Sequence, residues 1–465
     1  MANRFHVLTY AAALLLAMGV PGLRAEDASD ELIQTVIGLV SDKDKDLRAV
    51  GLQQIREDAK GEAATRRFAA LLPKLTPDGQ AGLLRALADR GDKAARPAVV
   101  KLLASKDRPA HLAAISALGA LGDAGDVPLL VPLLAAADSE ENAAVRESLR
   151  RLPGQAVGAA LVAELKSAPP GLRAALVQVL AARHAVDCAP ALLPVALDAD
   201  AGVREAAMAA LGQLAGPELI PGMVQGILRA EPGAEREAAE RAVMLVSNRI
   251  PTAAKRTAGL MAEFAKLSPE QQTILLPTLG RVGAALPLIR SSLAAGGERG
   301  AAALHALCNW PDGSVGPELL ELAQSAGSPA DRLTALRGLI RVAPLRDKRT
   351  DAQRLELLKK AMALATRDEE RNRVLTRCSA VRTVDSLRFV APYMEQPALA
   401  QAAAATVVEL AHHRELREPN KAEFYPALDT VIRVSHDADI VDRAQRYKKN
   451  QTRDTSRMPK PKGEG

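Results

Sequence analysis

The chain has 465 residues, of which 48% are hydrophobic and only 2% aromatic. This length allows two or three ordinary domains or one long repeat array, and the apolar content argues against a disordered chain. The formal net charge is +6, but residues 1–25 carry +2 and residues 448–465 carry +4, so residues 26–447 are neutral. A neutral body argues against nucleic acid as a partner.

The first 25 residues have the pattern of a secretory signal peptide. Arg4 gives a positively charged start, and a mostly apolar run from Val7 to Val20 ends at Pro21. The run is too short to span a bilayer comfortably. We predict cleavage after Ala25, which leaves a periplasmic or secreted bacterial protein without an integral membrane segment. An uncleaved membrane anchor is the alternative.

Pairs of amphipathic helices are predicted along the rest of the chain. After Ser29, a predicted N-cap, residues 31–40 and 47–58 form the first pair, joined by a charged turn. The pattern returns with a mean spacing of about 33 residues, which is typical of an α-solenoid. The second helices of the pairs are predicted to start near Arg48, Leu83, Leu112, Arg146, Arg173, Arg204, Arg236, Gln271, Arg299, Arg332, Arg371, Ala400 and Arg443.

Residues 196–216 are the clearest copy of the unit. Asp200 can cap a helix through its carboxylate, and apolar residues then recur at helical spacing. Gly212 and Gly216 offer a stop. One short apolar stripe buries too little surface to make a helix stable alone, so each pair requires neighbouring pairs.

The turns resemble those of the HEAT repeat family, including its branch of PBS-lyase HEAT-like repeats. The family pattern is an Asp, an Arg four residues later, and then A-x-x-A-L-G. It is found here at Asp44 and Arg48, Asp200 and Arg204, and Asp439 and Arg443; the A-L-G ending stands at 117–119 and 210–212, and prolines typical of first helices at Pro132, Pro194 and Pro221.

This resemblance implies an all-α, right-handed α-solenoid of about 12–13 HEAT-like helix pairs over residues 26–447. It also implies that Asp and Arg side chains form a ladder between neighbouring repeats. Residues 448–465 are predicted to be a disordered basic tail. Five of the eight aromatic residues after Ala25 lie in the last quarter of the chain, where we expect them to seal the last apolar face: Phe389, Tyr393, Phe424, Tyr425 and Tyr447.

Catalytic, cofactor-binding and metal-binding sites are not expected. His184 with Cys188 and His305 with Cys308 lie about four repeats apart and cannot share a metal, which needs about four converging ligands. The same distances predict that these cysteines and Cys378 are buried, unpaired thiols. The densest group of potential ligands is Glu409, His412, His413 and Glu415, which we interpret as a solvated helix end.

Four arginines form the candidate partner-binding site. Residues 331–388 carry fifteen Lys or Arg against eight Asp or Glu. The second helices of HEAT repeats usually line a concave surface, so a basic stripe there would suit an acidic protein. An ordinary charged helix face is the alternative. The four residues are Arg337, Arg341, Arg373 and Arg377.

The leading hypothesis for function is an exported, non-catalytic scaffold. It would act as a monomer and bind an unidentified protein partner, an acidic one if the arginines are used, through its concave surface. The label of the similar repeats suggests an alternative, a lyase or chaperone for a tetrapyrrole or another cofactor. A hydrolase with an unmarked site is a third hypothesis.

Overall fold

The computed structural model describes residues 25–58, 60–136 and 138–451, and these residues form 26 α-helices and no strand. The predicted signal peptide, apart from Ala25, and residues 452–465 of the predicted tail lie outside them. Within this part of the chain, no helix is both long enough and apolar enough to cross a membrane. The helices belong to two compact units, one ending at Ala210 and one beginning at Leu211, which we describe one at a time.

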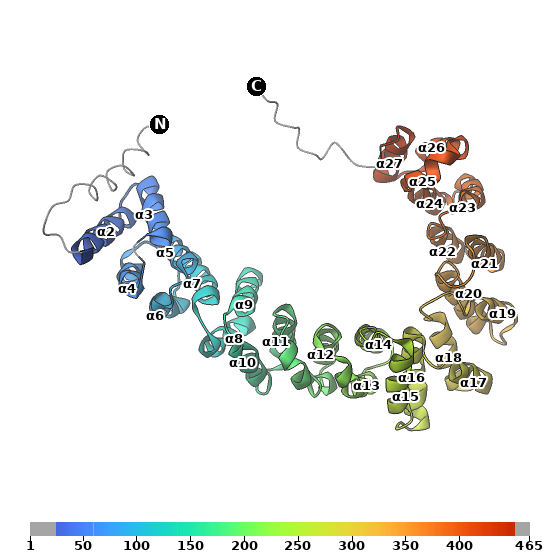
Figure 1. The fold of residues 1–465 in the computed structure, drawn as a ribbon, viewed down its shortest axis with the longest axis horizontal. Helices are drawn as coiled ribbons and strands as arrows, with labels where there is room; N and C mark the ends of the chain where they lie inside the picture. The colour runs from blue at the N-terminus through green and yellow to red at the C-terminus, as the bar shows by residue number, and fades with distance from the viewer. Residues whose placement is uncertain (1–24, 59, 137, 452–465) are drawn as a thin grey trace. The chain divides into compact units, whose positions relative to one another are not determined.

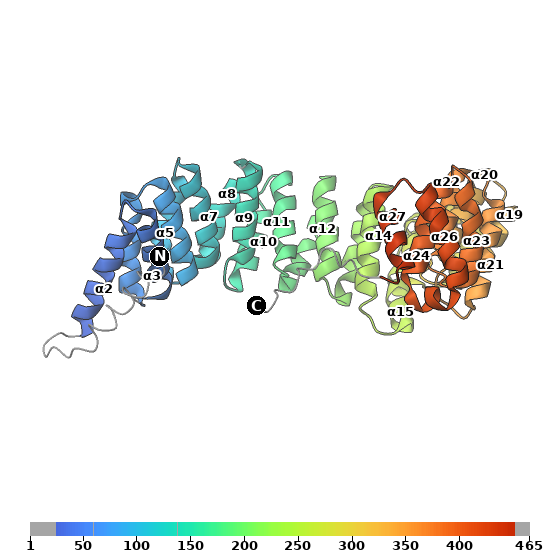
Figure 2. The ribbon, with the colours of Figure 1, turned by 90° about the horizontal axis from the view of Figure 1, so that it is seen from above.

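Unit 1 consists of helix hairpins whose first and second helices form two separate rows (Figure 1). Figure 2 shows these helices standing side by side. The first helices are α2 (Ala25–Val40), α4 (Glu62–Ala69), α6 (Arg96–Lys101), α8 (Val127–Ala136) and α10 (Ala156–Leu165). The second helices are α3 (Lys45–Glu57), α5 (Pro77–Arg90), α7 (Arg108–Leu121), α9 (Ser139–Arg151) and α11 (Pro170–Ala182). The next second helix, α12 (Ala201–Leu214), contains the boundary between the units.

Unit 2 repeats the same hairpin plan. Its first helices are α13 (Ile220–Arg229), α15 (Ala253–Phe264), α17 (Leu286–Ala295), α19 (Gly316–Ser325), α21 (Asp351–Leu364), α23 (Val384–Val390) and α26 (Lys421–Val434). Its second helices are α14 (Ala234–Ser247), α16 (Pro269–Val282), α18 (Gly297–Cys308), α20 (Pro329–Val342), α22 (Asp368–Cys378), α24 (Ala400–His412) and α27 (Ala438–Lys448), and the short α25 (Arg414–Arg417) precedes α26. The predicted all-α solenoid of helix pairs is confirmed.

The sixth hairpin is the exception to the predicted pattern. Residues 188–202, predicted to contain its first helix, instead hold two short 3₁₀ helices, Val186–Leu192 and Val195–Leu197. Pro190 lies within the first of them and Pro194 directly precedes the second. A proline removes a backbone donor and clashes with the preceding turn, which disfavours an α-helix across Pro190 and Pro194, although α8 accommodates Pro132.

One predicted helix start is wrong, and one predicted cap is confirmed. Helix α2 already begins at Ala25, so Ser29 is not its N-cap. Of the two predicted stops of α12, the helix runs past Gly212 and ends at Leu214, two residues before Gly216. Asp200 caps α12 as predicted, because its Oδ1 accepts a hydrogen bond from the backbone N–H of Val203 at 3.0 Å.

Gly212 and its counterparts instead allow consecutive second helices to approach closely. A Cβ atom on Gly212 would lie 3.2 Å from the Cα of Ala242 in α14, and one on Gly119 of α7 would lie 2.8 Å from the Cα of Ser148 in α9. At Gly280 of α16 a Cβ would overlap the backbone of Ala306 in α18. The glycine of the A-L-G ending is therefore a packing residue rather than a helix stop.

Arginines near the ends of second helices satisfy carbonyl groups of the preceding second helix. Arg183, directly after α11, donates hydrogen bonds to the carbonyl oxygens of Leu149, Arg150 and Leu152 at the end of α9, at 2.6–2.9 Å. Arg249, which follows α14, donates to three carbonyls at the end of α12. The last carbonyls of a helix have no hydrogen-bond donor within it, so these guanidinium groups supply the donors that the helix ends lack.

The arginines of the family pattern bind within their own hairpins. Arg48 donates to the carbonyl oxygens of Asp42 and Lys43, 2.9 and 2.7 Å away, in the turn before its helix. Arg204 likewise donates to the carbonyl oxygens of Asp198 and Ala199, in the turn before its helix. Arg443 also contacts the repeat before it, but its Nη2 lies 2.7 Å from Glu409 Oε1 of α24, not from an Asp as the resemblance implies. An Asp–Arg contact between neighbouring repeats is found instead at Arg173 and Asp198, 2.9 Å apart.

A buried arginine closes the C-terminal hairpin. Arg417 is 0% exposed, and its guanidinium lies 5.4 Å from the ring centre of Tyr447 in α27. It donates to the carbonyl of Ala411, to Glu418 and to the side-chain oxygen of Asn450. Two of the predicted aromatic cap residues, Phe424 and Tyr447, are buried, and Tyr447 takes part in this group of contacts.

Gly280→Ala tests the close approach of α16 and α18. Because the new methyl group would overlap the backbone of Ala306, we expect the free energy of unfolding to fall by about 1–3 kcal/mol, the usual cost of overpacking. Urea denaturation followed by circular dichroism measures this. Gly259→Ala in α15 is the matched control, since a Cβ there meets no atom within 4 Å. An equal loss in both variants would contradict the role given to Gly280.

Arg183→Met tests the capping of one helix by the next repeat. The change leaves three carbonyls at the end of α9 without this donor, so we expect a loss of about 1–3 kcal/mol in the free energy of unfolding. Arg150→Met is the control, because the Arg150 side chain is exposed and pairs with Glu147 of its own helix. If denaturation curves show both variants equally stable, carbonyl capping does not contribute measurably.

Candidate functional site

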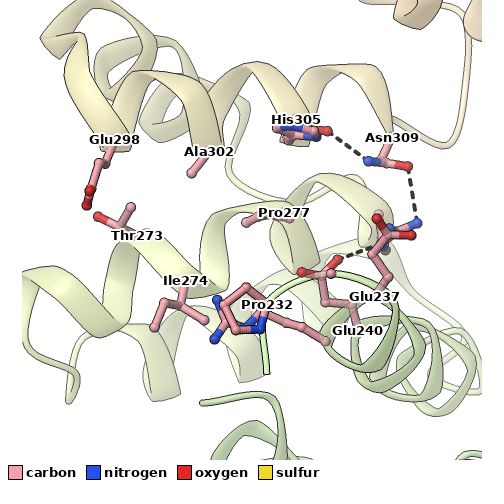
Figure 3. A pocket seen from close by; sticks show the side chains of 13 residues that line it. Pro232, Glu237, Glu240, Thr273, Ile274, Pro277, Glu298, Ala302, His305 and Asn309 are labelled. Atoms are coloured by element: carbon pink, nitrogen blue, oxygen red, sulfur yellow. Dashed lines mark hydrogen bonds and ion pairs between the residues drawn. The ribbon is translucent and has the colours of Figure 1, made fainter. Parts of the chain in front are cut away.

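A pocket of about 370 Å³ lies on the second helices of three successive hairpins in unit 2. Its residues recur every three or four positions along α14, α16 and α18, so each helix presents one face to it. Figure 3 shows these side chains around the pocket. The lining residues are Pro232, Gly233, Arg236, Glu237, Glu240, Thr273, Ile274, Pro277, Arg281, Glu298, Ala302, His305 and Asn309.

A hydrogen-bond network joins the three helices beside the pocket. Arg281 of α16 donates through Nε to Glu240 Oε2 of α14 at 2.8 Å and through Nη1 to Asn309 Oδ1 at 3.1 Å. Asn309, the residue after α18, in turn donates to the carbonyl oxygen of His305 at 3.0 Å (Figure 3). The network fixes the positions of three repeats relative to one another at this point of unit 2.

Glu240 is a buried carboxylate whose hydrogen bonding is incomplete. The residue is 4% exposed, and burial raises its pKa even though the ion pair with Arg281 opposes the shift. Its Oε2 atom accepts the bond from Arg281, while Oε1 accepts no hydrogen bond from any residue that the structure describes. An ionised carboxylate can accept about four hydrogen bonds, so Glu240 can accept further donors from the pocket.

The other charged groups of the pocket are unequally engaged. Arg236 donates to the carbonyl oxygen of Ala230 at 2.8 Å, so both arginines of the pocket already have acceptors. Glu237 is exposed and lies 3.6 Å from Arg241, an exposed pair that binds weakly. Glu298 is exposed and forms no ion pair within the described part of the chain. The negative charges of the pocket are therefore the available ones.

A proline in α16 adds a backbone acceptor. Pro277 has no N–H, so the carbonyl of Thr273, four residues earlier, lacks its usual helical hydrogen bond. Both residues line the pocket. The Thr273 hydroxyl donates to the carbonyl of Pro269 at 3.0 Å, which leaves the lone pairs of that hydroxyl oxygen available. The pocket is thus rich in acceptors.

Two of the four predicted partner-binding arginines act on the ends of neighbouring helices. Arg341 donates to the carbonyl oxygens of Cys308 and Trp310 beyond the end of α18. Arg377 donates to the carbonyl oxygen of Arg341 at 3.1 Å. Burial lowers the pKa of Arg341, and the positive charge of Arg377 contributes to the shift. Both side chains have the capping role described for Arg183 and Arg249.

The other two predicted arginines pair with acidic residues of α22. Arg337 of α20 lies 2.9 Å from the buried Glu370 and 3.3 Å from Glu369, and Arg373 lies 2.7 Å from Glu369. Arg367 also binds Glu370, so the positive charge of this region is partly compensated within the repeats. Each of the four arginines has a partner inside unit 2, and a role in binding another protein stays a prediction.

The cysteines are unpaired, as predicted, but only one is fully buried. Cys378 is buried, whereas Cys188 and Cys308 are half-buried. Burial raises the pKa of Cys308 and of Cys378 to about 12, so both thiols stay protonated near neutral pH. The sulfur of Cys308 fills the space beside Gly338, where a Cβ would overlap it.

The predicted ligand cluster near the C-terminus has other contacts. His412 Nδ1 lies 2.9 Å from the hydroxyl oxygen of Tyr447, and Glu409 binds Arg443. Burial, with a contribution from Arg382, lowers the pKa of His413. No three His, Cys, Asp or Glu side chains are arranged to hold a metal ion among the residues described here.

Apart from His305, which its spacing from Cys308 marks as a candidate metal ligand, the pocket residues were missed because nothing in the sequence marks them individually. Glu240 lies in an alternation of Ala and charged residues that reads as an ordinary amphipathic helix, and Asn309 follows the end of α18. The one signal that could have identified this place is Pro277, a proline inside the second helix of a repeat, where prolines normally belong to first helices.

Glu240→Gln tests the buried carboxylate through its pH dependence. Because burial raises the folded-state pKa above its usual value of 4.5, the folded protein binds this proton more tightly than the unfolded chain does. The stability of the wild type relative to the variant should therefore fall as the pH rises from 4 to 7. Urea denaturation at each pH measures the difference. A difference that grows with pH would mean that Arg281 lowers the pKa.

Comparison with known proteins agrees with the fold. A family model described as HEAT repeats matches residues 65–150 and 158–244. No curated protein matches the sequence significantly.

Similar solved structures include two of the karyopherin Kap121p, which are longer chains. One, bound to the extreme C-terminus of the protein phosphatase Cdc14p, has 11% identity and a TM-score of 0.46, covering 88% of this chain and 54% of that chain. The other, bound to Nup53p, has 10% identity and a TM-score of 0.47, covering 91% and 53%. The chain thus spans about half the length of these proteins, and the likeness concerns the fold alone. The helix pairs and the family match together show an α-solenoid fold that contains repeats of the HEAT family model at residues 65–150 and 158–244.

Proposed function

We propose that this protein is an exported, non-catalytic scaffold that binds another protein through the second-helix face of unit 2. The observation that carries the proposal is the pocket on α14, α16 and α18, with a buried carboxylate that still has an unused acceptor oxygen. A repeat array buries its apolar residues between hairpins and leaves a long, rigid row of side chains for a partner.

The arrangement supports binding better than catalysis. The pocket holds Glu240 and His305 but no nucleophile paired with a base among its lining residues. Its arginines are held by internal acceptors, so the site has a fixed geometry before any partner arrives. Export, cleavage after Ala25 and a monomeric state are parts of the proposal that rest on the sequence.

Site-specific photo-crosslinking tests the binding face. A photoreactive residue replaces Ala302, which lines the pocket, and in a matched variant it replaces Gln324, an exposed residue of the first helix α19. Crosslinking is carried out on cells of the native host, followed by isolation of the exported fraction. We expect a discrete product with one protein from position 302 and none from position 324.

Two outcomes would contradict the proposal. The same products from both positions would mean that contacts are not confined to the second-helix face. Absence of any product from position 302, with the variant folded and present in that fraction, would mean that this pocket does not meet a partner. Mass spectrometry of the recovered protein also shows whether it begins at Glu26.

A further inference from the structure

We propose that the pocket on α14, α16 and α18 receives the cationic side chain of an arginine or lysine from the partner protein. This inference rests on the proposed function and adds the chemistry that the site recognises. It concerns the pocket alone, whereas the four arginines predicted from the sequence lie on α20 and α22.

The charge balance of the pocket favours a cation over an anion. Its two guanidinium groups are occupied, Arg281 by Glu240 and Asn309 and Arg236 by the carbonyl of Ala230. The three carboxylates of the lining, Glu237, Glu240 and Glu298, also outnumber its two guanidinium groups, so the pocket has a net negative charge. A cation would meet Glu298, which has no ion pair within the described residues, and would add no unpaired charge to the site.

Glu240 supplies the specific interaction in the pocket. Glu240 is 4% exposed, and a buried carboxylate is stabilised by the hydrogen bonds that it accepts; among the described residues a single N–H, that of Arg281, donates to it. A guanidinium or ammonium group entering the pocket has several N–H donors and can supply the missing ones to Oε1.

Helix α16 adds a backbone acceptor at a residue that lines the pocket. The Thr273 carbonyl is released from its helical hydrogen bond by Pro277, and both residues line the pocket. Carbonyl and carboxylate oxygens together form a set that matches the several donors of one cationic side chain. The volume of about 370 Å³ lies near the lower end of the range for ligand pockets, about 300–1,000 Å³, which suits a side chain.

Fluorescence anisotropy of the full-length protein with labelled peptides tests the inference. The probe is a fluorescein-labelled hexa-arginine peptide, and its match has citrulline, the neutral isostere, at all six positions. We expect the arginine peptide to bind at least about tenfold more tightly than the citrulline peptide, since it gains several charge-assisted hydrogen bonds.

Three variants locate the binding. The double variant Glu237→Gln, Glu298→Gln removes exposed charges of the pocket and should weaken binding of the arginine peptide about fivefold or more. Ala302→Trp keeps every carboxylate but fills the pocket, and it should also weaken binding. Glu321→Gln, on the exposed surface of the first helix α19, removes one negative charge elsewhere and should leave binding unchanged.

Each outcome has a definite meaning. Equal binding of the two peptides, or undiminished binding to Ala302→Trp, would overturn the inference, because attraction would then not depend on a cation in the pocket. Equal weakening by Glu321→Gln would also overturn it, as a sign of general charge attraction. If Ala302 still crosslinks to one protein while the peptides fail, the scaffold function stands and only the chemistry assigned to the pocket is wrong.

Discussion

Hydrogen bonds from the arginine of one repeat to the helix carbonyls of the repeat before it are the interaction on which this array depends. Second helices stack side by side, and each ends with carbonyl groups that its own backbone cannot satisfy. Arg183, Arg249 and Arg341 supply donors at three such ends. Stacking of the second helices therefore gives polar backbone groups hydrogen-bond partners as well as burying apolar side chains. Gly119, Gly280 and their counterparts allow the helices to lie close enough for both.

The fold could be predicted from the sequence to a large extent, because it depends on periodicity. Apolar spacing predicts the helices, and a regular return of Asp and Arg predicts the hairpins. The cap formed by Asp200 was also predictable, since capping is local. The predictions failed at two local exceptions. Short 3₁₀ helices stand in place of an α-helix around Pro190 and Pro194, and Gly212 packs against α14 instead of ending α12.

The candidate site was not predictable, because its residues meet only through stacking. Clustering of positive charge in the sequence draws attention to Arg337 and Arg341, but the structure binds those side chains to Glu370 and to carbonyls of α18. Glu240 carries no signal of its own; its importance comes from burial beside Arg281, 41 residues away in sequence. A count of charged residues in the sequence locates a region rich in arginine. Whether an arginine can bind a partner depends on whether neighbouring groups in the fold already bind its side chain.

The buried guanidinium of Arg417 sets where the folded array stops. One of its acceptors is Asn450, which lies two residues beyond the end of α27. A chain truncated after the last helix would lose this acceptor from a guanidinium that solvent does not reach, while Glu418 would still pair with it; a hydrogen bond to a charged group contributes about 1.5–3 kcal/mol. The minimal autonomous domain thus extends past its last helix, to the residue whose amide oxygen completes the hydrogen bonding of Arg417.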